Sequence, residues 1–260
     1  MRSILVFADR TSAMTPRLDT ALSLARMTGG HVCVVVDTPV SRYIAMDPMG
    51  GTYVASDALN EALAQDDAHA AAIEEHLARE DVPFDVVRCE DDPMEAIAGA
   101  ARLADLVLVS HNCSFAGQLA LTARCPVLVV RDGMALTFPL KTAVVAWDGG
   151  DEAALALRGA TPLLRAAGNV GVVMVDDKPG GFPATDALRY LARHGVSAEL
   201  TTLTRQDSIE ETIDRAARGA GADLLVMGAF GHSRMREFLF GGVTRYFLES
   251  PDAPALLLAH

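Results

Sequence analysis

One stretch of the chain, GAFGHSRMREFLFGGVTR from Gly228 to Arg245, combines four glycines with three arginines and one histidine. Glycine allows positive φ angles and lets a ligand approach the backbone closely. A helix that begins near Gly242 would point its free N–H groups and the positive end of its dipole into this loop. These features indicate a cradle for an anion such as phosphate. A glycine-rich loop by itself is also typical of ordinary tight turns.

Polar side chains in the same stretch fit an anion. Thr244 offers a hydroxyl group, and Arg234, Arg236 or Arg245 could neutralise negative charge. His232 could contact a phosphate or could simply face solvent. The stretch therefore contains several candidate ligands for a phosphate group.

A carboxylate is predicted near this loop. Asp148 follows the apolar run 142–147 and precedes two glycines. At the end of a strand it could accept a hydrogen bond from an adenine amino group or a ribose hydroxyl. The alternative is that Asp148 caps a helix that starts near Asp151, because aspartate is a frequent N-cap residue.

Apolar runs that alternate with helical segments predict βαβ units, and the chain shows this pattern twice. The first half has five runs: Ser3–Ala8, His31–Val36, Phe84–Arg88, Leu106–Ser110 and Pro126–Val130. The second half also has five: Thr142–Trp147, Val170–Val175, Ser197–Leu203, Leu224–Gly228 and Pro254–Ala259. This repeat predicts duplication of a whole domain, with domains over residues 1–133 and 140–260. Each is expected to be an α/β sandwich with a mostly parallel five-stranded sheet, which binds ligands at the carboxyl ends of its strands.

The order of elements and the glycine spacing resemble a tandem, two-domain member of the universal stress protein (UspA) family. The nucleotide-binding branch of that family carries G-x2-G-x9-G-[S/T] after the fourth strand, and Gly228, Gly231 and Gly241 match this motif. The resemblance covers nearly the whole chain. It implies Rossmann-like (HUP-type) sandwiches that bind ATP, with or without Mg²⁺. The site that it implies consists of Asp148, Val175, Met227, Gly228, Gly231, Gly241, Gly242, Val243 and Thr244.

The chain departs from the family motif at Gly242, where the motif has Ser or Thr. Glycine keeps the backbone N–H but removes a hydroxyl. The loss of one neutral hydrogen bond costs about 0.5–1.5 kcal/mol, which is about tenfold in affinity at most. Weakened ATP binding is therefore expected, unless Thr244 compensates.

The first half has a degenerate version of the loop. Asp9 aligns with Asp148, but residues 111–125 contain only one glycine, Gly117, and the connection is about ten residues shorter. Loss of ordinary nucleotide binding is expected there. An insertion over residues 37–56, which contains Met46, Met49 and Tyr53, is expected to cover its own sheet edge or the other domain.

Composition excludes several classes of partner. The formal net charge of −12 disfavours nucleic acid and anionic membranes, whose binding depends on Lys and Arg. The four cysteines lack metal-ligand spacing, which favours reduced thiols and no metal site. The N-terminus does not resemble a signal peptide, and no apolar run is long enough to span a bilayer, so a cytoplasmic protein is expected.

The leading functional hypothesis is a non-catalytic stress-response protein that binds an adenine nucleotide in its second domain. The loop has no Walker lysine and no paired carboxylates for magnesium. By resemblance, Val127–Val130 and Ala255–Leu258 should pair as an intramolecular pseudo-dimer, with a homodimer or another protein partner left open. One alternative is a nucleotide-independent protein-interaction module. A more distant one is an adenylating enzyme, which would carry S-G-G-x-D-S where this chain has DGGDEA, residues 148–153.

Overall fold

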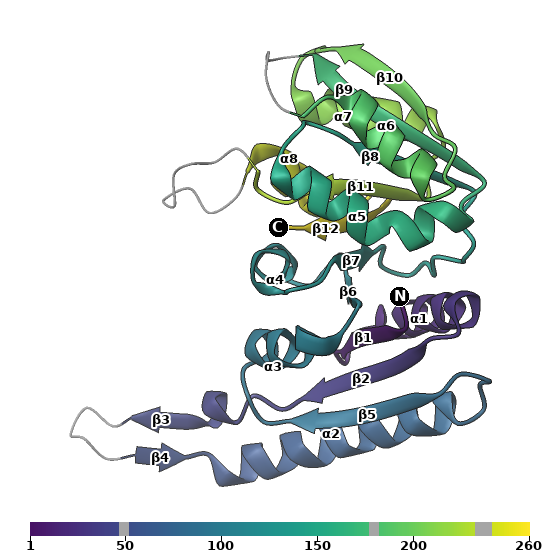
Figure 1. Ribbon diagram of the computed structural model, residues 1–260. Helices are drawn as coiled ribbons and strands as arrows, with labels where there is room; N and C mark the ends of the chain where they lie inside the picture. Colours follow the sequence, from purple (N-terminus) through teal and green to yellow (C-terminus); the bar gives the residue numbers. More distant parts are fainter. Residues whose placement is uncertain (47–51, 177–181, 232–240) are drawn as a thin grey trace.

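The computed structural model describes residues 1–46, 52–176, 182–231 and 241–260. One ten-stranded sheet runs through both halves of the chain, and helices cover both of its faces (Figure 1). The first half contributes strands β1 (Ser3–Ala8), β2 (His31–Asp37), β5 (Phe84–Cys89), β6 (Leu106–Ser110) and β7 (Val127–Val130). The second half contributes β8 (Thr142–Ala146), β9 (Asn169–Asp176), β10 (Glu199–Thr204), β11 (Leu224–Gly228) and β12 (Ala255–Ala259).

The helices follow the same duplicated plan. The first half holds α1 (Met14–Thr28), α2 (Ser56–Leu77), α3 (Pro93–Ala100), α4 (Ala116–Thr122) and the short 3₁₀ helices η1 (Val40–Tyr43) and η2 (Ala101–Leu103). The second half holds α5 (Asp151–Ala166), α6 (Ala184–Arg193), α7 (Ile209–Gly219) and α8 (Gly242–Glu249). The α/β class and the tandem layout are confirmed.

The two halves join through their last strands. The strand order is β10-β9-β8-β11-β12-β7-β6-β1-β2-β5, and the neighbouring pairs are parallel apart from β12 and β7. Leu257 pairs with Leu128 at the centre of this antiparallel contact. The predicted pairing of the final strands is confirmed. Through this contact, the two predicted five-stranded sheets form one continuous ten-stranded sheet.

The apolar runs are continuous because both faces of the sheet are buried. Along β1, Ile4 and Val6 enter the core under α1, α2, α5 and α6, whereas Leu5 and Phe7 enter the core under α3, α4, α7 and α8. Each of these cores includes residues from both halves. The apolar interior is therefore shared across the β7–β12 contact.

The insertion after β2 forms a small antiparallel hairpin from β3 (Ile44–Met46) and β4 (Thr52–Val54), which the sequence did not predict. Figure 1 shows these strands projecting away from the second half, so the expectation that they cover it is wrong for the described part. Ile44 and Val54 are exposed. Met49 lies outside the described residues.

Candidate functional site

The segments after β8 and β11 meet at one edge of the sheet, because these strands are parallel neighbours. A Cβ atom on Gly231 would lie 3.6 Å from Asp148 Oδ2, so the carboxylate lies beside the start of the glycine loop. Asp148 Oδ1 also accepts a hydrogen bond from the Gly150 N–H at 2.9 Å. The N-cap residue of α5 is Gly150 itself, so Asp148 does not take the capping position.

Gly228 brings the first turn of α5 against the end of β11. A Cβ atom on Gly228 would lie 2.6 Å from Ala153 N and 2.7 Å from the Glu152 carbonyl carbon, which is closer than side chains pack in proteins. No other residue type has the space to occupy this position without a shift of the helix. Gly228 therefore sets the distance between the helix and the loop.

The two flanks of the loop are tied together inside the protein. Phe230 has a φ of 62°, in the left-handed region, and its N–H donates to Thr244 Oγ1 at 3.3 Å. Thr244 is buried with 2 % of its surface exposed. Its hydroxyl, considered above as a phosphate ligand, thus holds the loop onto α8, and any contact with phosphate stays a prediction.

Helix α8 begins beside this tie. Gly241 is its N-cap residue. The backbone N–H groups of Gly242 and Val243 lie in the first turn, so they have no hydrogen-bond acceptor within the helix. A Cβ atom on Gly242 would meet nothing within 4 Å, so a side chain fits there. Arg245 pairs with Glu249 at 2.7 Å, whereas His232, Arg234 and Arg236 lie outside the described residues.

Val175 lies near the end of β9 and Met227 near the end of β11, on the two sides of β8. Both side chains point to the core under α3, α4, α7 and α8. Met227 is buried with 4 % exposed and belongs to this apolar core, and Val175 is half-buried against it. They can form an apolar wall below the edge where Asp148 lies. Their contact with an adenine ring stays a prediction.

Glu152 is a feature of the site that the sequence reasoning missed. Its Oε2 would lie 2.9 Å from a Cβ on Gly231 and 3.3 Å from one on Gly150, so a second carboxylate approaches the mouth of the loop. An acidic residue in the first turn of a helix is usually explained by the helix dipole alone, which hid this role. The site therefore presents two carboxylates, from Asp148 and Glu152, beside a predicted phosphate cradle.

A further segment closes onto the same edge. The Phe182 N–H donates to the Gly149 carbonyl oxygen at 2.9 Å, and the Trp147 indole N–H donates to the Phe182 carbonyl oxygen at 2.9 Å. Trp147 is buried, whereas Phe182 is 63 % exposed. The segment that begins at Phe182 is thus pinned beside Asp148, with an exposed aromatic ring.

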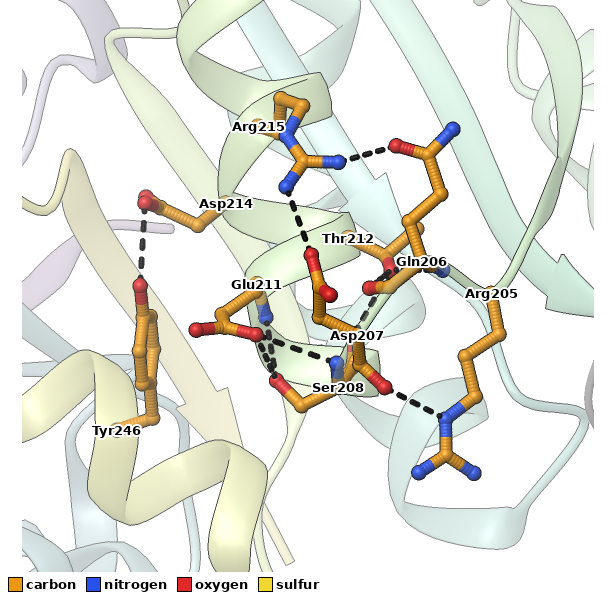
Figure 2. Close-up of polar contacts among 9 residues, drawn as sticks. All are labelled: Arg205, Gln206, Asp207, Ser208, Glu211, Thr212, Asp214, Arg215 and Tyr246. Atoms are coloured by element: carbon orange, nitrogen blue, oxygen red, sulfur yellow. Dashed lines mark hydrogen bonds and ion pairs between the residues drawn. The ribbon is translucent and has the colours of Figure 1, made fainter.

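A polar network fixes the connection from β10 to α7 (Figure 2). Ser208 and Glu211 form a capping box, in which each side chain accepts a hydrogen bond from the other residue's backbone N–H at 3.2 Å. Asp207 has a φ of 58°, and its carboxylate pairs with Arg215 at 3.4 Å. These contacts hold the first turn of α7 at the carboxyl edge of the second half.

The same network holds α8 in place. The Tyr246 hydroxyl donates to Asp214 Oδ2 at 3.3 Å (Figure 2). Arg218 Nε donates to the same carboxylate at 2.8 Å. Desolvation and the negative charge of Asp214 raise the pKa of Tyr246, which keeps its hydroxyl protonated as a donor. Tyr246 therefore links α8, the helix that follows the glycine loop, to α7.

Comparison with solved structures shows how widely this arrangement is shared. The universal stress protein from Archaeoglobus fulgidus DSM 4304 covers 99 % of this chain and 96 % of its own, with 14 % identity and a TM-score of 0.71. A functionally unknown protein from Pseudomonas aeruginosa PAO1 covers 100 % of this chain and 92 % of its own, with 18 % identity and a TM-score of 0.60. The fold of the whole chain is thus found in other proteins.

A family model described as the universal stress protein family matches residues 139–258, which include the glycine cradle and Asp148. Residues 139–258 therefore form a universal stress protein domain. A universal stress protein solved in complex with cAMP covers 46 % of this chain and 97 % of its own, with 21 % identity and a TM-score of 0.36. No curated protein sequence matches the chain.

The first half of the chain fills its equivalent edge with a side chain of its own. Arg17 from α1 is fully buried, and its guanidinium donates to Ser110 Oγ at 2.8 Å, to Asp9 Oδ2 at 2.8 Å and to the Phe7 carbonyl oxygen. Ser110 ends β6, where the second half has Gly228 at the end of β11. The Asp9 carboxylate is therefore engaged within the protein.

A second acidic group of the first half lies at the end of β2. Asp37 Oδ1 is buried and has no hydrogen-bond partner in the described part of the chain. Burial is the main cause that raises the pKa of Asp37 to about 7; the negative charges of Asp92, Asp66 and Asp91 also raise it, and Arg42 lowers it. The folded protein therefore favours the neutral form of this carboxyl group.

Replacing Asp37 by asparagine should make stability less dependent on pH. Because the folded pKa is raised, the carboxyl group contributes stability below about pH 4, and this contribution is lost as pH rises through 7. At pH 8, Asp37→Asn should raise the free energy of unfolding by about 1 kcal/mol, below the full linkage value because the side chain is only partly buried. The gain should vanish near pH 4.

Urea unfolding from pH 4 to pH 8 measures this effect. Asp19→Asn, at an exposed position on α1, is the matched control and should show no such trend. A constant difference between Asp37→Asn and the parent protein across this range would contradict the assignment.

Proposed function

We propose that this protein binds ATP or another adenine nucleotide at the carboxyl edge of its second half and acts as a non-catalytic, cytoplasmic stress-response protein. The observation that carries the proposal is the convergence of Asp148, the Gly228–Gly231 turn and the start of α8 at one place. The four free cysteines agree with a reducing compartment.

The backbone of the cradle suits a phosphate chain. Gly231 and Gly241 leave the backbone accessible, and the first turn of α8 directs N–H groups and the positive end of the helix dipole toward the loop. Asp148 would accept a hydrogen bond from the adenine amino group or from a ribose hydroxyl. Val175 and Met227 would provide the apolar side of the site.

The two carboxylates indicate that the nucleotide binds together with a divalent cation such as Mg²⁺. Asp148 and Glu152 both approach Gly231, so a phosphate chain would bring negative charge beside them. A cation would reduce this repulsion, because it carries the largest local charge in such a site. Among the described residues, no cluster of three or more acidic, histidine or cysteine side chains could hold a metal without the nucleotide.

The first half is expected to leave nucleotide binding to the second. The connection from β6 to β7 has sixteen residues, whereas the connection from β11 to β12 has twenty-six, so the first half lacks the corresponding loop. In addition, Arg17 occupies the interior beside Asp9 and Ser110. One nucleotide per chain is therefore the proposed stoichiometry.

The residue types of the glycine loop support a binding role. The stretch from Gly228 to Arg245 has no lysine. Among the described residues, no group of three or more His, Cys, Asp or Glu side chains could hold a catalytic metal. The chain is proposed to sense or carry the nucleotide.

Calorimetric titration with ATP and magnesium tests the proposal. The parent protein should bind about one nucleotide per chain, and Gly231→Val/Gly241→Val should lose at least a hundredfold in affinity, because two side chains would fill the cradle. The fold should tolerate both changes, since a Cβ on Gly231 meets the ends of the Glu152 and Asp148 side chains and one on Gly241 lies 3.5 Å from Phe230 Cα. Repeating the titration with EDTA should weaken binding.

A gain-of-function variant makes the test independent of damage to the fold. Gly242→Ser adds the hydroxyl that the family motif has, in open space, and should tighten binding by up to about tenfold. No heat and no thermal shift at millimolar ATP for the parent protein and for Gly242→Ser would refute the proposal. The protein-interaction module, which Gly242 and the degenerate loop of the first half also favour, would then be the better function.

A further inference from the structure

A cleft of about 440 Å³ lies at the junction of the two halves, and none of the residues labelled in Figure 2 lines it. It is lined by the connection between α4 and β7 in the first half and by α5, α6, Ala259 and His260 in the second half. This volume lies within the range of small-molecule sites, about 300–1,000 Å³. Because both halves contribute, the cleft depends on the tandem arrangement.

A close contact between the halves shapes the floor of the cleft. A Cβ atom on Gly159 of α5 would lie 2.3 Å from Pro126 Cγ, so only glycine lets the α4–β7 connection lie against this helix. Both residues line the cleft. The backbone of α5 at Gly159 thus packs closely against Pro126, which fixes this wall of the cleft.

Two arginines line the cleft, one from each half: Arg124 and Arg158. Both are exposed, and neither has an ion pair or a side-chain hydrogen bond within the described ranges of the chain. Both guanidinium groups are therefore available to a ligand. Two unpaired guanidinium groups in one cleft favour an oxyanion, which arginine binds through paired hydrogen bonds.

The remaining walls are partly apolar. Leu155 lines the cleft and is 41 % exposed, and the half-buried Tyr190 lines it from α6. The Tyr190 ring lies against His194, with ring centroids 4.4 Å apart, which limits its movement. An exposed leucine beside an oriented aromatic ring suits the apolar body of a ligand.

We propose that the cleft binds a small molecule that carries an oxyanion, phosphate or carboxylate, on an aromatic or apolar body. Arg124 and Arg158 hold the oxyanion from opposite halves, and Leu155 and Tyr190 contact the body. The inference does not depend on nucleotide binding in the glycine cradle. The cleft would be a second ligand site, and both halves of the chain contribute residues to it.

Calorimetric titration with phenyl phosphate, benzoate and inorganic phosphate tests the proposal. Phenyl phosphate or benzoate should bind saturably, and inorganic phosphate more weakly because it lacks the apolar body. Arg124→Gln/Arg158→Gln should lose at least tenfold in affinity. The matched control is Arg102→Gln/Arg165→Gln, which removes the same charge from two exposed arginines outside the cleft and should bind like the parent protein.

The glycine-cradle variant Gly231→Val/Gly241→Val locates the bound probe. If the probe binds in the cleft, this variant keeps its affinity. Loss of binding in the cradle variant but not in Arg124→Gln/Arg158→Gln would place the probe in the cradle and overturn the proposal. Equal losses in the two arginine pairs, or no heat with any probe at millimolar concentration, would also overturn it.

Discussion

Replacing Gly228 by alanine should lower the free energy of unfolding by about 3 kcal/mol. The new Cβ would lie 2.6 Å from Ala153 N and 2.7 Å from the Glu152 carbonyl carbon, and both are backbone atoms of α5. Backbone atoms cannot rotate away as the end of a side chain can, so the helix must move as a unit and its packing on the sheet is strained. Urea unfolding followed by circular dichroism measures the change.

Gly99→Ala is the matched control for this substitution. Gly99 lies in α3, and a Cβ there would meet nothing within 4 Å. Alanine should stabilise the protein by up to about 1 kcal/mol, because it favours the helix over the unfolded chain. If Gly228→Ala were as stable as the parent protein, the close approach of α5 to β11 would be wrong.

Replacing Arg17 by alanine should destabilise the protein by about 3–5 kcal/mol, which is typical when one partner of a buried ion pair is removed. Arg17 is fully buried, and its loss leaves Asp9 without its guanidinium partner and Ser110 without a donor. The vacated volume would also leave a cavity beside β1. The expected change is a fall in the free energy of unfolding measured by urea titration.

Arg26→Ala on the same helix is the control. Arg26 forms ion pairs with Glu80 and Asp81 at the surface, where its side chain is 43 % exposed. Exposed pairs contribute about 0–1 kcal/mol, so this variant should unfold close to the parent protein. If both variants lost the same free energy of unfolding, the buried contacts of Arg17 with Asp9 and Ser110 would contribute no special stability.

The sheet could be predicted because its chemistry is local. Strands that are buried on both faces need an apolar residue at every position, and runs such as Leu106–Ser110 and Leu224–Gly228 have the same bounds in the sequence and in the structure. The β3–β4 hairpin escaped prediction because each strand has three residues, too few to show an alternating pattern. The pairing of β7 with β12 came from the family resemblance and not from a local signal.

The candidate site divides in the same way. The sequence alone determined the duplicated α/β plan, the glycine spacing at Gly228, Gly231 and Gly241, and the place of Asp148, because these depend on strand order and backbone freedom. Only the tertiary structure decided that Glu152 approaches the cradle and that Arg17 fills the edge of the first half. A sequence pattern indicates which face of a helix is buried, but the path of a charged side chain depends on neighbours far away in the chain, as Arg17 shows with Ser110, 93 residues later.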